Sequence, residues 1–252
     1  MSFKDKVVLV TGSSSGIGAS TVIEFAKEGA HVIIVGRNET KLEDVREKCE
    51  KYGKNPLVIK ADVSKDADGK KIVDETIEKF GGIDVLVNNA GTGGIVDVTN
   101  ENFMEGYDRI INVNLRGVVY ITHLAIPHLI KSKGNIINIS SVAGTNTVGN
   151  ADLIAYNMSK AGLNHFTRCA ALKLASYGVR VNTISPGPVR TDIIKHPTME
   201  SITWEHISEK TALKRVSEPV EIADLILFLA SEKAKGVTGS NFVSDNGMMI
   251  LN

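Results

Sequence analysis

A tyrosine and a lysine four residues apart are the first pair in this sequence whose types and spacing could do chemistry. Tyr156 and Lys160 lie near the start of a long stretch with helical periodicity, residues 154–177. Residues four apart share one helix face, so both side chains can point into the same cleft. A phenol ordinarily has a pKa of ~10, which a neighbouring ammonium lowers toward neutrality. The pair predicts general acid–base catalysis by Tyr156; the structural alternative is an aromatic residue beside a solvated lysine.

A glycine-rich stretch is the second feature with chemical meaning. Residues 11–18 read Thr-Gly-Ser-Ser-Ser-Gly-Ile-Gly, after an apolar run and before a helical stretch. Gly12 can turn tightly, and Gly16 and Gly18 let the backbone approach a pyrophosphate and the neighbouring strand. The start of the helix would aim free N–H groups at the phosphate. The position between a strand and a helix indicates a dinucleotide site rather than a turn needed only for packing.

The end of the second expected strand indicates which dinucleotide is bound. Arg37 stands 19 residues after Gly18, and Gly36 before it supplies no carboxylate. An acidic residue here would bind the ribose hydroxyls and repel a 2′-phosphate, whereas an arginine would pair with that phosphate. We therefore expect NADP(H) rather than NAD(H); the alternative is a solvated arginine at the start of a loop.

These residues are embedded in a regular alternation of short β-branched runs and longer helical stretches. We predict an α/β fold in a single domain over residues 1–252, a doubly wound Rossmann-type parallel sheet of about seven strands with helices on both faces. The expected strands are residues 7–11, 31–35, 56–61, 83–88, 135–140, 180–184 and 241–244, and the clearest helical stretches are residues 16–28, 39–51, 67–80 and 154–177.

Residues 191–215 depart from this alternation. The stretch is polar, carries Trp204, the only tryptophan, and separates a strand from a helix expected to begin near Pro219. A long insertion after a strand is either an active-site lid or a plain surface excursion. We refer to residues 191–215 as the lid segment.

Six motifs occur in order and together resemble the short-chain dehydrogenase/reductase family in its compact form. The resemblance covers essentially the whole chain. The motifs are residues 11–18, 88–91 (Asn-Asn-Ala-Gly), 112–115 (Asn-Val-Asn-Leu), 139–144 (Ile-Ser-Ser-Val-Ala-Gly), the pair Tyr156 and Lys160, and 185–191 (Ser-Pro-Gly-Pro-Val-Arg-Thr).

The resemblance implies a catalytic set of Asn114, Ser141, Tyr156 and Lys160. Tyr156 would protonate the carbonyl oxygen during reduction, and Lys160 would bind the nicotinamide ribose and lower the pKa of Tyr156. Ser141 would hydrogen-bond the substrate oxygen, with the adjacent Ser140 as an alternative. Asn114 would hold a water in a proton relay through Lys160.

The resemblance also implies where NADP(H) is bound and that the protein forms a homo-oligomer, since similar proteins are mostly homotetramers. The implied cofactor-binding residues are Gly12, Ser14, Ser15, Gly16, Ile17, Gly18, Arg37, Asn38, Asp62 and Val63 beside the adenine, Asn89, Ala90 and Gly91, Tyr156 and Lys160, and Val189 and Thr191 at the carboxamide.

The sequence departs from the family pattern in two places. Ser141 and Tyr156 are 15 residues apart, a little more than is usual, so residues 145–155 are expected to bulge over the substrate. Near the C-terminus, Ser-Asp-Asn-Gly at residues 244–247 replaces the usual Asp-Gly-Gly. The second departure leaves the local turn open.

Composition excludes several other classes of function. The 29 basic and 29 acidic side chains balance, which disfavours nucleic acid or an anionic membrane as partner. The six histidines form no HExxH pattern and there are only two cysteines, Cys49 and Cys169, so no metal site is expected and a zinc alcohol dehydrogenase is disfavoured. No signal segment or membrane-spanning run is recognised, and a cytoplasmic location is expected.

Two alternatives to a general carbonyl reductase stay open. Within the family, the substrate is a 3-oxoacyl thioester instead of another small carbonyl or alcohol compound. Outside catalysis, the chain is a silent dinucleotide-binding regulator that has kept the fold, because a fold alone does not settle function. The presence of all four residues of the catalytic set favours an enzyme.

Overall fold

Seven short strands rich in valine and isoleucine form the centre of the computed structural model, which describes residues 2–147, 153–192 and 203–251. All neighbouring strands are parallel, in the order β3-β2-β1-β4-β5-β6-β7. Val8 of β1 is in register with Val32 of β2 and with Val85 of β4. The strands are β1 (Val7–Val10), β2 (His31–Gly36), β3 (Leu57–Lys60), β4 (Val85–Asn88), β5 (Asn135–Ile139), β6 (Arg180–Pro186) and β7 (Asn241–Ser244).

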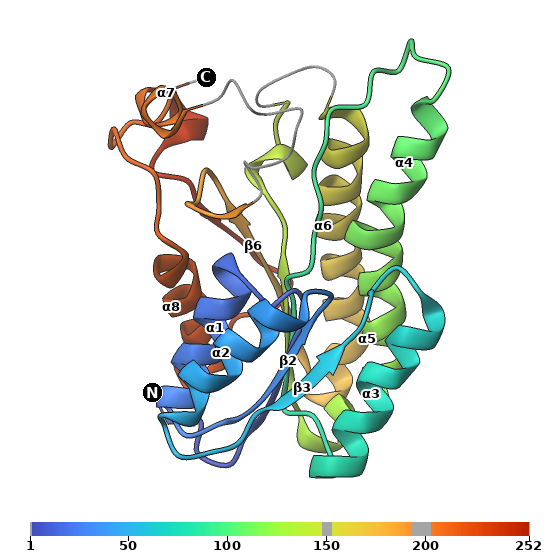
Figure 1. Cartoon of the computed structure of the whole chain (residues 1–252), viewed down its shortest axis with the longest axis vertical. Coiled ribbons are helices and arrows are strands. Elements are labelled where there is room, and N and C mark those ends of the chain that lie inside the picture. Colours follow the sequence, from blue (N-terminus) through green and yellow to red (C-terminus); the bar gives the residue numbers. More distant parts are fainter. Residues whose placement is uncertain (1, 148–152, 193–202, 252) are drawn as a thin grey trace.

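Helices cover both faces of the sheet (Figure 1). One face carries α1 (Gly16–Lys27), α2 (Glu39–Glu50) and α8 (Pro219–Ala230), and the other carries α3 (Asp66–Phe80), α5 (Gly117–Ser132) and α6 (Ile154–Leu174). Beside α6 stands α4 (Phe103–Ile111), which continues into α5 through one wide turn of π type, η1 (Asn112–Arg116). The short α7 (Trp204–Glu209) lies beyond the carboxyl ends of the strands (Figure 1).

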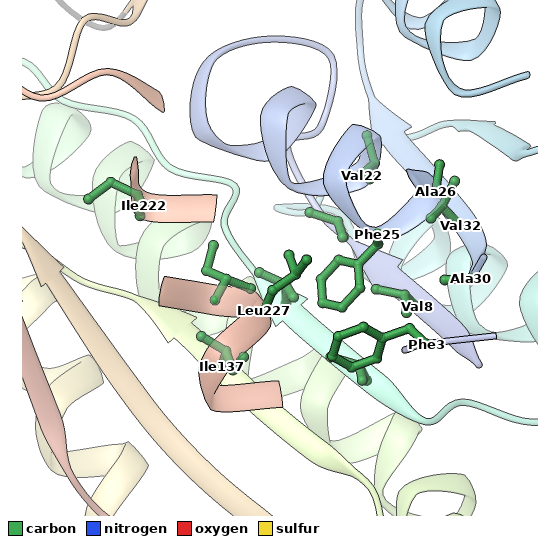
Figure 2. Close-up of a cluster of buried hydrophobic side chains, with 14 of the residues drawn as sticks. Phe3, Val8, Val22, Phe25, Ala26, Ala30, Val32, Ile137, Ile222 and Leu227 are labelled. Atoms are coloured by element: carbon green, nitrogen blue, oxygen red, sulfur yellow. The ribbon is translucent and has the colours of Figure 1, made fainter. Parts of the chain in front are cut away.

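The sheet separates two hydrophobic cores because successive side chains of a strand point to opposite faces. Val8 and Val10 belong to the core beneath α1 and α8, and Leu9 belongs to the core beneath α3 and α5. In the first core Phe3 meets Phe25 edge to face, with ring centroids 4.8 Å apart (Figure 2). Burying one such ring contributes roughly 2–3 kcal/mol, so the cores hold the strand ends rigidly in place.

The structure confirms the predicted fold class, and the predicted bounds differ from the observed ones by at most three residues. The strand expected at residues 83–88 begins at Val85, because the Asp84 carboxylate accepts a hydrogen bond from the Val7 amide at 2.9 Å. The strand expected at residues 180–184 extends to Pro186, which pairs with β7. The helix expected to reach residue 177 ends at Leu174 and is followed by a 3₁₀ turn, Ala175–Tyr177.

Within the described part of the chain, no helix is long and apolar enough to cross a bilayer. The same residues contain no group of three or more histidine, cysteine or acidic side chains arranged to hold a metal ion. Residues 193–202 of the lid segment and residues 148–152 of the expected bulge lie outside the described residues.

Candidate active site

The predicted site residues follow the carboxyl ends of six neighbouring strands, where the order of the sheet reverses between β1 and β4. In open parallel sheets this edge is where ligands bind. From β3 across to β6 the residues are Asp62 and Val63 after β3, Arg37 and Asn38 after β2, Gly12 to Gly18 after β1, Asn89 to Gly91 after β4, Ser141 after β5, and Val189 and Thr191 after β6.

The glycine-rich loop has the backbone that a phosphate site needs. Gly12 has a φ of +64°, in the left-handed region that favours glycine. A Cβ on Gly18 would lie 2.5 Å from the Asn89 amide nitrogen and 2.5 Å from the Gly12 carbonyl oxygen. Ser15 begins α1 without a side-chain capping bond, so the first N–H groups of the helix stay available to an anion. The loop therefore fits a dinucleotide phosphate.

Thr11, which the sequence analysis did not single out, ties this loop to the end of β4. Its hydroxyl accepts hydrogen bonds from the amides of Asn89 and Ala90, both at 3.1 Å. In return, the Asn89 side chain donates to the carbonyls of Thr11 and Gly12 at 2.9 and 3.0 Å. The side-chain nitrogen of Asn89 thus fixes the position of the loop. The partly buried Ile17 packs its side chain against the core beneath α1.

Charged and polar side chains surround the position expected for the adenine ribose. The Arg37 guanidinium is 3.8 Å from the Asp62 carboxylate and its side chain is 75% exposed. Burial alone would raise the pKa of Asp62, but hydrogen bonds from Ser64 and the charge of Arg37 outweigh burial and lower it. The Asn38 side chain accepts from the Lys41 amide at 3.0 Å and so caps α2. Part of the predicted role of Asn38 is therefore structural.

A hollow of about 540 Å³ opens on the outer side of the glycine-rich loop, between α1, α2 and the chain after β6. It brings Ser14, Ser15 and Gly16 together with Thr191, and also with Trp204 of α7. Lys41 of α2 forms an ion pair with Asp192 at 2.5 Å across this hollow. Periodicity gave no signal for that pair because its members are 151 residues apart.

At the other end of the site, Lys160 is buried beneath Tyr156 on α6. Its side chain donates to the Ile139 carbonyl at 2.8 Å, and its Nζ lies 5.7 Å from the centroid of the Tyr156 ring. Burial lowers the pKa of Lys160 to about 8. The two side chains share one face of the helix, as their spacing predicts.

The pKa of Tyr156 differs from the expected direction. Burial of the phenol raises this pKa, and only a hydrogen bond with the Ser141 side chain opposes the rise. The Lys160 ammonium does not reverse this rise, and it is directed at the Ile139 carbonyl. Desolvation of the phenolate is therefore the larger effect.

The structure separates the two candidate serines. Ser140 is buried and donates to the Lys160 carbonyl at 3.2 Å, so its hydroxyl supports α6. Ser141 begins the short turn Val142–Gly144, where its hydroxyl accepts from the Ala143 amide at 3.2 Å and also contacts Tyr156. Ser141 is the serine that faces the tyrosine hydroxyl, a distinction that adjacent identical residues in a sequence cannot provide.

Asn114 reaches the site from the wide turn η1. Turns of this type frequently occur at functional sites because the extra residue redirects a side chain. The buried Asn114 side chain accepts from the Thr92 amide at 2.8 Å and donates to the Ser159 hydroxyl at 3.1 Å. Ser159 in turn donates to the Tyr156 carbonyl at 2.7 Å. Thr92 and Ser159 were not predicted, since neither belongs to a recognisable motif.

Gly91 separates Asn114 from Lys160. A Cβ on Gly91 would lie 3.6 Å from the Asn114 side-chain oxygen and 3.6 Å from the Lys160 nitrogen. The two polar groups therefore border the same space beside Gly91. The Val63 carbonyl oxygen would lie 2.4 Å from a Cβ on Gly117, and the buried Val189 forms a β-bridge with Ser217.

Comparison with known proteins extends the resemblance to nearly the full chain. A family model described as enoyl-(acyl carrier protein) reductase matches residues 12–249. The chain is 37% identical over 263 aligned residues to the 3-oxoacyl-[acyl-carrier-protein] reductase of Thermotoga maritima, covering 99% of this chain and 100% of that protein.

Solved structures show the same similarity. A short-chain dehydrogenase/reductase of unknown function from Caenorhabditis elegans, crystallised with cofactor, matches with a TM-score of 0.90 and 34% identity, covering 98% of this chain and 96% of that one. The L-sorbose reductase from Gluconobacter frateurii, complexed with NADPH and L-sorbose, matches with a TM-score of 0.91 and 30% identity, covering 99% and 98%. The 3-ketoacyl-(acyl-carrier-protein) reductase from Brucella melitensis, complexed with NADH, matches with a TM-score of 0.88 and 32% identity, covering 98% and 99%.

Proposed function

The chain belongs to the short-chain dehydrogenase/reductase family of oxidoreductases, and from that premise we propose that it is an NADP(H)-dependent enzyme acting on a carbonyl or alcohol. The observation that carries the proposal is the contact between the Tyr156 and Ser141 side chains, next to the buried Lys160. These groups lie at the same edge of the sheet as the glycine-rich loop, so the proton donor is next to the expected dinucleotide site.

In the proposed reaction, the bound dinucleotide supplies or accepts the hydride. Tyr156 donates its proton to the carbonyl oxygen during reduction and takes it back during oxidation. The Ser141 hydroxyl hydrogen-bonds that oxygen and keeps it within reach of the phenol. Burial raises the Tyr156 pKa, which favours the protonated phenol, the form that donates a proton during reduction.

Lys160 and Asn114 support the tyrosine. The Lys160 ammonium, held by the Ile139 carbonyl, supplies positive charge beneath the phenol and is placed to bind a ribose hydroxyl. Asn114 is fixed by Thr92 and Ser159, and its oxygen faces the same space beside Gly91 as the Lys160 nitrogen. This arrangement supports a relay of protons through Lys160.

The preference for NADP(H) rests on the adenine-ribose end. Arg37 presents an exposed guanidinium there, and no acidic side chain stands at Gly36. A charge-assisted contact with a 2′-phosphate is stronger than a neutral hydrogen bond. The similar L-sorbose reductase was solved with NADPH, whereas the Brucella reductase was solved with NADH. The proposal therefore depends on the residues of this chain.

A 3-oxoacyl thioester is the second candidate substrate, favoured by the similarity to the Thermotoga reductase along the whole of both chains. We also propose self-association into a homo-oligomer. Val220 and Phe228 of α8 and Val243 of the edge strand β7 are 41%, 36% and 46% exposed, an apolar set that a second copy would cover. Light scattering of the purified protein tests this assembly.

The test of function is a panel of ketones, a 3-oxoacyl thioester and alcohols, each assayed with both dinucleotides. We expect reduction of at least one carbonyl with NADPH, and a kcat/KM for NADPH above that for NADH. Binding of a dinucleotide without turnover of any substrate would instead support the silent regulator. Equal or better use of NADH would contradict the NADP(H) assignment and show that Arg37 is a solvated loop residue.

A further inference from the structure

Asn246 occupies a backbone conformation that usually requires glycine. Its φ is +53°, and it stands at the middle position of residues 245–247, where the family pattern has the first glycine of Asp-Gly-Gly. Asparagine is one of the few residues that tolerates the left-handed region. Unlike glycine, it brings a side chain that can both donate and accept hydrogen bonds.

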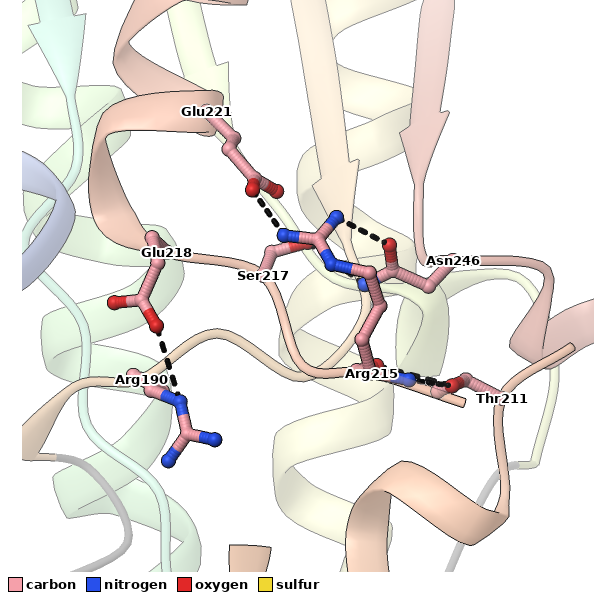
Figure 3. A network of polar contacts seen from close by, with 7 residues as sticks. All are labelled: Arg190, Thr211, Arg215, Ser217, Glu218, Glu221 and Asn246. Atoms are coloured by element: carbon pink, nitrogen blue, oxygen red, sulfur yellow. Dashed lines mark hydrogen bonds and ion pairs between the residues drawn. The ribbon is translucent and has the colours of Figure 1, made fainter. Parts of the chain in front are cut away.

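Both ends of the Asn246 side chain are used (Figure 3). Its amide nitrogen donates to the Ser217 hydroxyl at 2.9 Å, and its oxygen accepts from the Arg215 guanidinium at 3.0 Å. Arg215 also forms an ion pair with Glu221 in the first turn of α8. The contacts join the chain after β7 to the end of the lid segment and to α8.

Ser217 connects this cluster to the candidate active site. Its amide donates to the Pro188 carbonyl at 3.1 Å, and its carbonyl accepts from the Arg190 amide at 2.9 Å. These bonds make the bridge between Val189 and Ser217, and Ser217 is 2% exposed. The partner of Ser217 is therefore the segment that carries Val189 and Thr191.

We propose that Asn246 is a positioning residue for the nicotinamide end of the cofactor, acting through Ser217 on residues 188–191. The inference rests on the proposed function and on the family resemblance, which implies that Val189 and Thr191 hold the carboxamide. A glycine at position 246 would allow the same turn but would leave the Ser217 hydroxyl and the Arg215 guanidinium without these two bonds. Asn246 thus adds a constraint on the carboxamide segment that the usual motif lacks.

The decisive variant is Asn246→Gly, because glycine suits the left-handed backbone and removes only the side chain. We would measure its affinity for NADPH and for adenosine 2′,5′-bisphosphate, a fragment without the nicotinamide. We expect NADPH binding to weaken roughly fivefold, the effect of about one neutral hydrogen bond, and fragment binding to stay unchanged. Lys133→Gly is the matched control, since Lys133 also has a positive φ, +51°, but lies outside the site.

Two further variants separate positioning from a general loss of structure. Asn246→Asp keeps an oxygen for Arg215 but has no N–H for the Ser217 hydroxyl, which already bonds the Glu221 carboxylate, so it should weaken NADPH binding as Asn246→Gly does. Ser217→Ala should weaken NADPH binding to the same degree as Asn246→Gly. Combining Ser217→Ala with Asn246→Gly should weaken NADPH binding little further, because both variants remove the same hydrogen bond between Asn246 and Ser217.

Equal weakening of NADPH and the fragment in Asn246→Gly would overturn the inference, and so would no weakening of either. If the wild-type chain binds NADH in preference, the same comparison uses NADH and ADP, and the inference about Asn246 survives the loss of the NADP assignment. A wild-type chain that binds neither dinucleotide would overturn the proposed function and the inference together.

Discussion

The two ends of the candidate cofactor site are built in opposite ways. At the adenine-ribose end, Arg37 is 75% exposed and touches one carboxylate at 3.8 Å. At the catalytic end, Lys160 is 4% exposed and Asn114 is fully buried, and each makes short hydrogen bonds to neighbouring elements. An exposed charge contributes little to folding and can change at low cost, whereas a buried polar group is costly unless it is paired. The residues proposed for catalysis are thus held rigidly, whereas the residue proposed to set the cofactor preference is free to change.

The largest expected effect removes the proton donor at the buried end. Tyr156→Phe keeps the ring but loses the only ionisable atom, and we expect kcat to fall roughly 10²-fold or more. Affinity for the dinucleotide should change little. Tyr177→Phe, at an exposed residue after α6, is the matched control and should behave as wild type. Near-normal turnover by purified Tyr156→Phe would refute the mechanism.

The next effect contrasts two adjacent serines. Ser141→Ala removes the hydroxyl that contacts Tyr156, and we expect kcat to fall roughly tenfold to 10²-fold. Ser140→Ala removes only the bond to the Lys160 carbonyl, so it should lower the free energy of unfolding by about 1 kcal/mol with a small change in rate. Steady-state kinetics and denaturant titration measure both quantities. The reverse ranking of rates would show that Ser140 is the substrate-facing serine.

At the exposed end, Arg37→Ser should change preference without harming the fold. Loss of a charge-assisted contact predicts a roughly tenfold fall in the ratio of kcat/KM for NADPH to that for NADH. The melting temperature should stay the same because Arg37 lies on the surface. Arg168→Ser on α6, also an exposed arginine, controls for the loss of one positive charge. An unchanged cofactor ratio would contradict the assignment.

The smallest expected effect concerns stability, and its sign follows from the pKa of Lys160. Burial lowers the pKa of Lys160 in the folded protein to about 8, compared with 10.5 for an ordinary lysine. Below pH 8 the buried side chain carries its charge, and the cost of burying that charge opposes folding. Lys160→Met should raise the free energy of unfolding by about 1–3 kcal/mol at neutral pH, less the contribution of the lost hydrogen bond to the Ile139 carbonyl.

Between pH about 8 and 10.5 the unfolded wild-type chain binds the Lys160 proton more tightly than the folded chain does. The free energy of unfolding of the wild type therefore increases relative to that of Lys160→Met as the pH rises through this window. Denaturant titrations of both proteins at pH 7 and pH 10 measure the difference. An advantage of the variant that grows with pH would contradict the assigned pKa.

Patterns in the sequence predicted the parts of the fold that depend on local order. Short β-branched runs marked all seven strands, and four of the first strands are nearly all apolar, as strands covered on both faces need to be. The pairing of Tyr156 and Lys160 on one face also followed from spacing. Contacts between distant segments could not be read in this way, and Lys41 with Asp192 is an example.

The direction of the Tyr156 pKa also required the structure. The sequence places a lysine near the phenol, but it does not show that the lysine points at the Ile139 carbonyl or that desolvation of the partly buried phenol raises its pKa. Likewise, the motif Asn-Val-Asn-Leu marks Asn114 without showing that a wide turn directs it inward. Local spacing identifies the residues of such a site, whereas packing decides what each side chain faces.

The close approach of Gly36 to Ser14 restricts the evolutionary routes open to this chain. A Cβ at position 36 would lie 3.0 Å from both the Cβ and the hydroxyl oxygen of Ser14, and 3.2 Å from Leu42. An acidic residue that reads ribose hydroxyls therefore enters position 36 more easily once position 14 has become smaller. If a lineage moved from NADP toward NAD, Ser14 would be expected to change first and Gly36 second. The packing of these two small residues would therefore determine the order of the mutations.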